Sequence, residues 1–121
     1  MHITYTTRAG KLVYSLHGEL TMQTVAHFTD VFSRAQESTG LDKIVLNMAE
    51  VALIDSCGLG ALVSAQRSVQ AGNGEIQLVG VRAGVMEMLR ITKLDSRFSI
   101  YETVEDALGV DTAGPEPSVQ T

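Results

Sequence analysis

Residues 51–66 read VALIDSCGLGALVSAQ, and this stretch decides the fold of the chain. Its first four residues are apolar and lead into a polar corner, Asp55-Ser56-Cys57. Two glycines with a leucine between them follow, and then apolar residues at helical spacing predict a helix of about four turns. In an open parallel sheet, sites collect where strands end and helices begin. The corner has three interpretations: a catalytic nucleophile, a helix cap, or a site that another protein modifies.

Toward the N-terminus, the polarity pattern predicts a hairpin, a helix and an interior strand. Residues 2–6 and 12–16 alternate in polarity and flank a turn at 7–10. The following helix spans residues 21–38, with Thr21 as its candidate N-cap and Gly40 at its C-terminal end. The run at 43–48 is rich in branched apolar residues, as is usual for a strand covered on both faces.

Toward the C-terminus, the pattern predicts strands at 75–80 and 98–101 and short helices at 85–92 and 104–108. The whole order predicts an α/β fold with a mixed β-sheet, mostly parallel, an N-terminal hairpin and about four helices. Residues 1–110 are expected to form one domain. Residues 111–121 are polar and contain both prolines, so we expect a flexible C-terminal tail.

Composition excludes several classes of function. The chain has 121 residues, 45% of them hydrophobic, and a formal net charge of −5. An acidic chain lacks the basic face that direct binding of nucleic acid needs. No apolar run approaches the roughly 20 residues of a membrane span, and the N-terminus lacks the pattern of a signal peptide. A single cysteine forms no internal disulfide, so a cytoplasmic protein without membrane contact is expected.

The enzyme interpretations lack essential parts. A serine nucleophile elbow needs glycine two residues before the serine, where Ile54 stands before Ser56. All three histidines precede Ser56 in the chain and have no cysteine partner at the spacing of metal ligands. Cys57 is either a reactive thiol at a helix start or a small apolar residue that fills a gap under the helix. We therefore expect no enzyme activity and no metal site.

The two glycines after the corner also have two interpretations. A dinucleotide loop requires a third glycine at position 63, where Val63 stands. The alternative is that Gly58 and Gly60 let the first helical turn lie close to the sheet. We favour the second interpretation, and no cofactor is expected.

Charge chemistry favours a modification site at the corner. Asp55 or Ser56 can cap the helix by accepting from its free N–H groups. An exposed Ser56 at the positive end of the helix dipole would tolerate a phosphate of about −1.5 to −2 charges. A partner packed over the same spot would have to bury that charge beside Asp55. Phosphorylation would then keep the fold and abolish the interface.

These residues resemble the STAS domain of bacterial anti-sigma factor antagonists. The resemblance rests on Asp55-Ser56-Cys57-Gly58-Leu59-Gly60, on the preceding Ile44-Val45-Leu46-Asn47-Met48, and on Gly18-Glu19-Leu20 before the first helix. Gly74-Glu75 leading into Leu78-Val79 also matches. The resemblance covers roughly residues 2–108. Two positions depart from the family: Cys57 stands where Ser or Thr is frequent, and Thr21 stands where Asp is frequent.

The resemblance implies a partner-switching protein. The unphosphorylated form would bind an anti-sigma factor that is also a serine kinase of the histidine-kinase-like ATPase fold, and so release a sigma factor. Phosphorylation of Ser56 would abolish binding, and a PP2C-type phosphatase would restore it. The implied partner-binding residues are Asp55, Ser56, Cys57, Gly58, Leu59 and Thr21. The alternative is a STAS scaffold or transporter-associated subunit with no phospho-switch.

Overall fold

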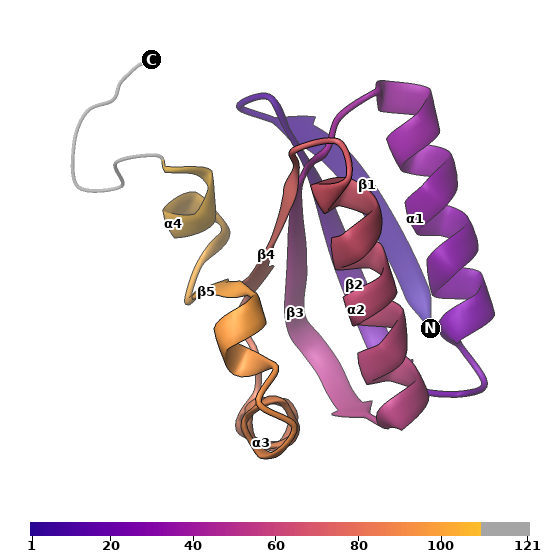
Figure 1. Cartoon of the computed structure of the whole chain (residues 1–121), viewed down its shortest axis with the longest axis vertical. Coiled ribbons are helices and arrows are strands. Elements are labelled where there is room, and N and C mark those ends of the chain that lie inside the picture. The colour runs from indigo at the N-terminus through magenta and orange to yellow at the C-terminus, as the bar shows by residue number, and fades with distance from the viewer. Residues whose placement is uncertain (110–121) are drawn as a thin grey trace.

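The computed structural model describes residues 1–109, which form five strands, four α-helices and one 3₁₀ turn (Figure 1). The strands are β1 His2–Arg8, β2 Lys11–Leu20, β3 Lys43–Ile54, β4 Glu75–Val79 and β5 Ser99–Tyr101. The helices are α1 Val25–Thr39, α2 Ser56–Gln70, α3 Ala83–Ile91 and α4 Val104–Leu108, and the 3₁₀ turn is Asp95–Arg97. The predicted tail, 111–121, lies outside the described residues.

The strands form one sheet in the order β1-β2-β3-β4-β5. β1 is antiparallel to β2, and every other neighbouring pair is parallel. Because parallel crossovers are right-handed, α1 and α2 lie side by side on one face of the sheet, while α4 lies on the other (Figure 1). The predicted mixed sheet with an N-terminal hairpin and four helices is confirmed.

The main core lies between the sheet and the helices α1 and α2. Tyr14 of β2 is fully buried there, and its ring stacks on Phe32 of α1 at a centroid distance of 5.2 Å. The Tyr14 hydroxyl donates a hydrogen bond of 2.8 Å to the Phe32 carbonyl, which satisfies its only polar group. A smaller core on the opposite face joins one valine from each of β2, β3 and β4 to α4: Val13, Val45 and Val79.

Three predicted boundaries are wrong. The first helix begins at Val25 rather than at residue 21, because the carbonyl of Thr21 accepts from the N–H groups of both Thr24 and Val25 in a preceding turn. Thr21 is therefore not its N-cap. β2 continues to Leu20, beyond the alternating residues 12–16 that predicted it, with register shifts against β3. The strand predicted at 43–48 continues to Ile54, so the apolar part of the opening stretch belongs to β3.

The two glycines of the α2 start have different roles. A Cβ on Gly58 would collide with the Leu20 carbonyl oxygen and lie 2.7 Å from a side-chain carbon of Ile54. The first turn of α2 therefore touches the ends of β2 and β3, as the close-approach interpretation predicted. A Cβ on Gly60 would have no neighbour within 4 Å, so that interpretation is wrong for Gly60.

This difference yields a matched pair of variants. Gly58→Ala should lower the free energy of unfolding by about 1–3 kcal/mol, because backbone must move to admit the methyl group. Gly60→Ala should raise it by up to about 1 kcal/mol, because alanine suits an open helical position better than glycine. Urea denaturation of both variants measures the two changes. Equal effects at the two positions would contradict the close packing of α2 on Leu20.

Candidate functional site

The site is built around the carboxylate of Asp55, the N-cap of α2. Its backbone is extended, and its Oδ1 accepts a hydrogen bond of 2.9 Å from the Gly58 N–H. Asp55, rather than Ser56, is thus the residue that satisfies the free N–H of the first helical turn. Ser56 is the first helical residue, and its hydroxyl is not used as the cap.

The same carboxylate also holds the loop between β2 and α1. Oδ2 of Asp55 accepts a hydrogen bond of 3.0 Å from the N–H of Met22, 33 positions away in the sequence. The N–H of Asp55 donates to the carbonyl of Leu20 at 3.3 Å. Hydrogen bonds from Gly58 and Met22 hold the pKa of the Asp55 carboxyl below its usual value, because they stabilise the ionised form.

The six residues predicted as a partner site divide into two groups. Ser56 and Cys57 are exposed, and Asp55 is half-buried between them and the loop. The gap-filling interpretation of Cys57 is therefore wrong. Gly58, Leu59 and Thr21 are buried. They lie inside the domain beneath the exposed corner, so they present little surface for a partner to contact directly.

Thr21 directly precedes Met22, whose N–H Asp55 binds, so it belongs to the loop that is held at the corner. Its hydroxyl accepts from the Gln23 N–H at 3.4 Å, and its N–H donates to the Thr24 hydroxyl at 2.9 Å. The Thr24 hydroxyl in turn donates to the Glu19 carbonyl at 2.8 Å. Threonines thus order the loop by local hydrogen bonds, and Asp55 supplies the carboxylate at this corner.

Sequence reasoning missed two exposed apolar side chains beside the corner. Met22, whose N–H is bound by Asp55, is 69% exposed. Leu53, two residues before Asp55 on β3, is 51% exposed. The sequence pattern places Met22 in a helix over residues 21–38, whereas α1 begins only at Val25, and Leu53 stands in an apolar run, residues 51–54. The sequence shows no alternation of polarity over these residues, so only the structure reveals that Leu53 is exposed while Ile54 is buried.

The chemistry of the corner is that of an exposed hydroxyl beside an ionised carboxylate at a helix N-terminus. Within residues 1–109, no three His, Cys, Asp or Glu side chains are grouped so as to hold a metal ion. None of the helices in this part of the chain is both long enough and apolar enough to cross a membrane. The fold and the corner together define a small α/β domain that exposes Ser56 at the first position of α2, beside a hydrogen-bonded Asp55.

The chain belongs to the STAS domain family, whose model matches residues 2–107. A provisionally named anti-sigma factor antagonist of Thermotoga neapolitana is 39% identical over 57% of this chain, and the match spans 61% of that relative's length. The anti-sigma-B factor antagonist of Staphylococcus aureus is 26% identical over 87% of this chain and 96% of its own.

Solved structures agree with this assignment. A provisionally named anti-sigma factor antagonist from Thermotoga maritima has a TM-score of 0.83 at 26% identity, covering 88% of this chain and 92% of its own. The Bacillus cell fate determinant SpoIIAA in its phosphorylated form has a TM-score of 0.70 at 20% identity, covering 89% of this chain and 97% of its own. The second likeness concerns the fold alone.

The lowered pKa of Asp55 makes its contribution to stability depend on pH. A carboxyl whose pKa is depressed by folding stabilises the native state above its unfolded-state value and loses that contribution as the pH falls through the folded-state value. Asp55→Asn should therefore be less stable than the parent chain at neutral pH, and the gap should close below about pH 4. Urea denaturation over a pH series measures the gap. A gap that stays constant with pH would show that ionisation of Asp55 does not hold the corner.

Proposed function

We propose that this chain is an anti-sigma factor antagonist that is switched by phosphorylation of Ser56. In its unphosphorylated form it binds an anti-sigma factor that is also a serine kinase, and a sigma factor is released. The carrying observation is that Ser56 is exposed at the first position of α2, while Asp55 makes the structural hydrogen bonds. The serine is thus free to be modified without loss of the helix cap.

The arrangement of hydrogen bonds indicates why a phosphate would repel the partner. The N–H of Gly58 is bound by the Asp55 side chain, and the N–H of Leu59 is bound by the Asp55 carbonyl. Two donors of the first turn are therefore already used. A phosphate on Ser56 would present most of its charge to solvent, next to a second anion. A partner that covers the corner would have to desolvate both charges, which is unfavourable without new cationic partners.

Met22 and Leu53 supply the apolar part of the proposed contact surface. Both are large and exposed; the N–H of Met22 is bound by Asp55, and Leu53 precedes Asp55 by two residues. Burial of apolar surface favours association, while charges at an interface contribute to its specificity. The names of the Staphylococcus and Thermotoga relatives support an anti-sigma factor as the partner. A PP2C-type phosphatase is the proposed enzyme that resets the switch.

Two substitutions of Ser56 should separate binding from modification. Ser56→Asp should weaken binding to an anti-sigma factor kinase from the same genome by at least about tenfold, because desolvating one more interfacial charge costs roughly 2–5 kcal/mol. Ser56→Ala should bind like the parent chain and accept no phosphate. Both should fold normally, since a carboxylate at a helix N-terminus is mildly stabilising and the cap is Asp55. Titration calorimetry with ATP present measures the affinities.

Ser64 provides the matched control, because it is exposed on α2 but lies two turns from the corner. Ser64→Asp adds the same charge and should leave the affinity unchanged. Phosphosite mapping after incubation with the kinase should place the phosphate on Ser56. Equal affinities of the Ser56→Asp and Ser56→Ala variants would favour the alternative, a STAS scaffold without a phospho-switch.

A further inference from the structure

The outer edge of the sheet at β1 is long and unpaired. β1 has seven residues, and among residues 1–109 it pairs only with β2. The opposite edge, β5, has three residues. The β1 sequence HITYTTR contains no proline, and its one formal charge is Arg8 at the end. It thus lacks the charges and prolines that usually prevent an edge strand from pairing with another chain.

The hairpin geometry determines which backbone groups face outward. Arg8 pairs with Lys11 across a two-residue turn, Ala9-Gly10, in which both residues have positive φ, as a type I′ turn requires. Such a turn closes on a hydrogen-bonded pair, and the pairs then alternate along the ladder. The register runs without a shift from His2 to Arg8. The N–H and C=O groups of Ile3, Tyr5 and Thr7 are therefore directed away from β2.

The outward-directed N–H and C=O groups of Ile3, Tyr5 and Thr7 can all pair with the same groups of a second copy of β1 in one antiparallel register. With a two-fold axis at Tyr5, Tyr5 lies opposite the partner's Tyr5, and Ile3 lies opposite the partner's Thr7. All three outward residues then meet as hydrogen-bonded pairs, which exchange N–H and C=O groups in both directions. An axis at Thr4 or Thr6 would leave one of the three residues unpaired. A two-fold contact of this kind closes on itself and stops at two chains.

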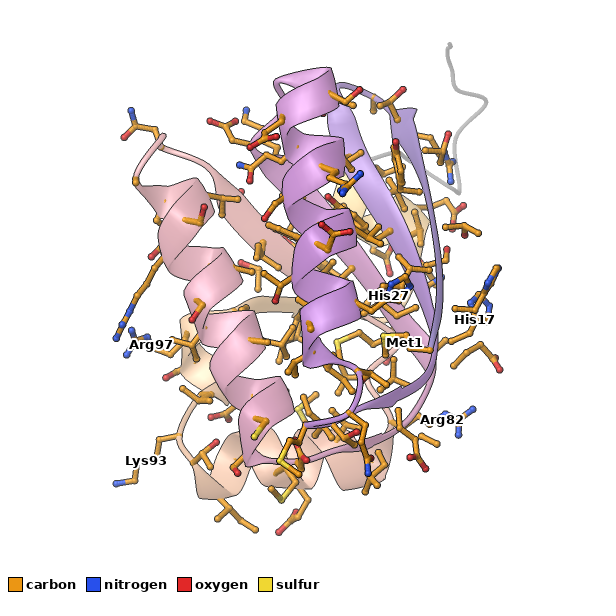
Figure 2. All side chains as sticks on the ribbon, turned by 90° about the vertical axis from the view of Figure 1, so that its right-hand side faces the viewer. Met1, His17, His27, Arg82, Lys93 and Arg97 are labelled. Carbon is orange, nitrogen blue, oxygen red and sulfur yellow. The ribbon has the colours of Figure 1, made fainter. Side chains whose placement is uncertain are left out.

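The side chains agree with the same register. Thr4 would lie opposite the partner's Thr6, and threonine pairs and aromatic pairs are favourable across antiparallel strands. Tyr5 is 47% exposed, and its ring packs on Tyr14 at 5.9 Å, on the helix-covered face of the sheet. Even-numbered residues of β1 share the opposite face with His17, which pairs with His2 and points away from the helices in Figure 2.

We propose that β1 pairs antiparallel with β1 of a second copy of this chain, about a two-fold axis at Tyr5. The two five-stranded sheets then form one continuous sheet. The contact is independent of the proposed switch, because Ser56 follows β3, the central strand, two strands in from the β1 edge. Both copies keep Ser56 uncovered.

The backbone part of the contact is tested by proline. Sedimentation velocity over a wide range of concentration should show a reversible monomer–dimer equilibrium for the parent chain. Tyr5→Pro removes an outward N–H without breaking the β1–β2 ladder and should weaken the dimer by at least about tenfold. Tyr5→Val, the matched control, keeps the N–H and should weaken it less. A monomer at every concentration, or a dimer that proline does not weaken, would overturn the proposal.

The register is tested by charge pairs that do not depend on proline. Thr4→Lys combined with Thr6→Glu places opposite charges across the two-fold axis and should strengthen the dimer. Thr4→Lys combined with Thr6→Lys places like charges there and should weaken it. Circular dichroism confirms that each variant is folded. Equal dimer affinities of the two double variants would exclude this register, and with it the proposed contact.

Discussion

The close contact between the first turn of α2 and the end of β2 is the constraint on which the rest of the site depends. Gly58 lies against the Leu20 carbonyl, and no side chain fits between them. Asp55 then bonds to the N–H of Gly58 with one oxygen and to the N–H of Met22 with the other. One glycine and one carboxylate thereby join a helix start, a strand end and a loop from another part of the chain. Ser56 is displayed on this joint, and its position is determined by its neighbours rather than by its own contacts.

The residue that holds the corner, Asp55, is thus different from the residue proposed to be modified, Ser56. The groups that hold the corner are buried or hydrogen-bonded, whereas the serine takes no part in the cap. A charge added to that serine therefore changes the surface without unfolding the helix, since the N-terminal end of a helix dipole favours anions. In the proposed switch, the exposed side chains of Met22 and Leu53 would give a partner apolar surface to bury, and the charge on Ser56 would decide whether that burial is favourable. Under this proposal, affinity and control would reside in different side chains of one surface.

The two proposed interaction surfaces, the corner at Ser56 and the edge of β1, use different parts of the sheet. Side chains and a helix start form the first, at the carboxyl end of the central strand β3. Backbone groups form the second, along the outer edge of β1. Because β2 stands between β1 and β3, occupation of one surface does not cover the other. In a small domain, unsatisfied backbone N–H and C=O groups remain mainly at the edges of sheets and at the ends of helices.

The sequence by itself determined the alternation of strands and helices, the N-terminal hairpin, the polar corner and the exposure of Ser56, because each depends on residues close together in the chain. It also predicted the need for Gly58, since glycine at a helix start indicates close packing. Only the tertiary structure decided that Asp55 is the cap and bridges to Met22, that Gly60 has open space around it, that Cys57 is exposed, and that Leu59 and Thr21 are buried. These properties depend on which distant segments meet, and the Asp55–Met22 bond joins residues 33 positions apart, beyond the reach of any local pattern.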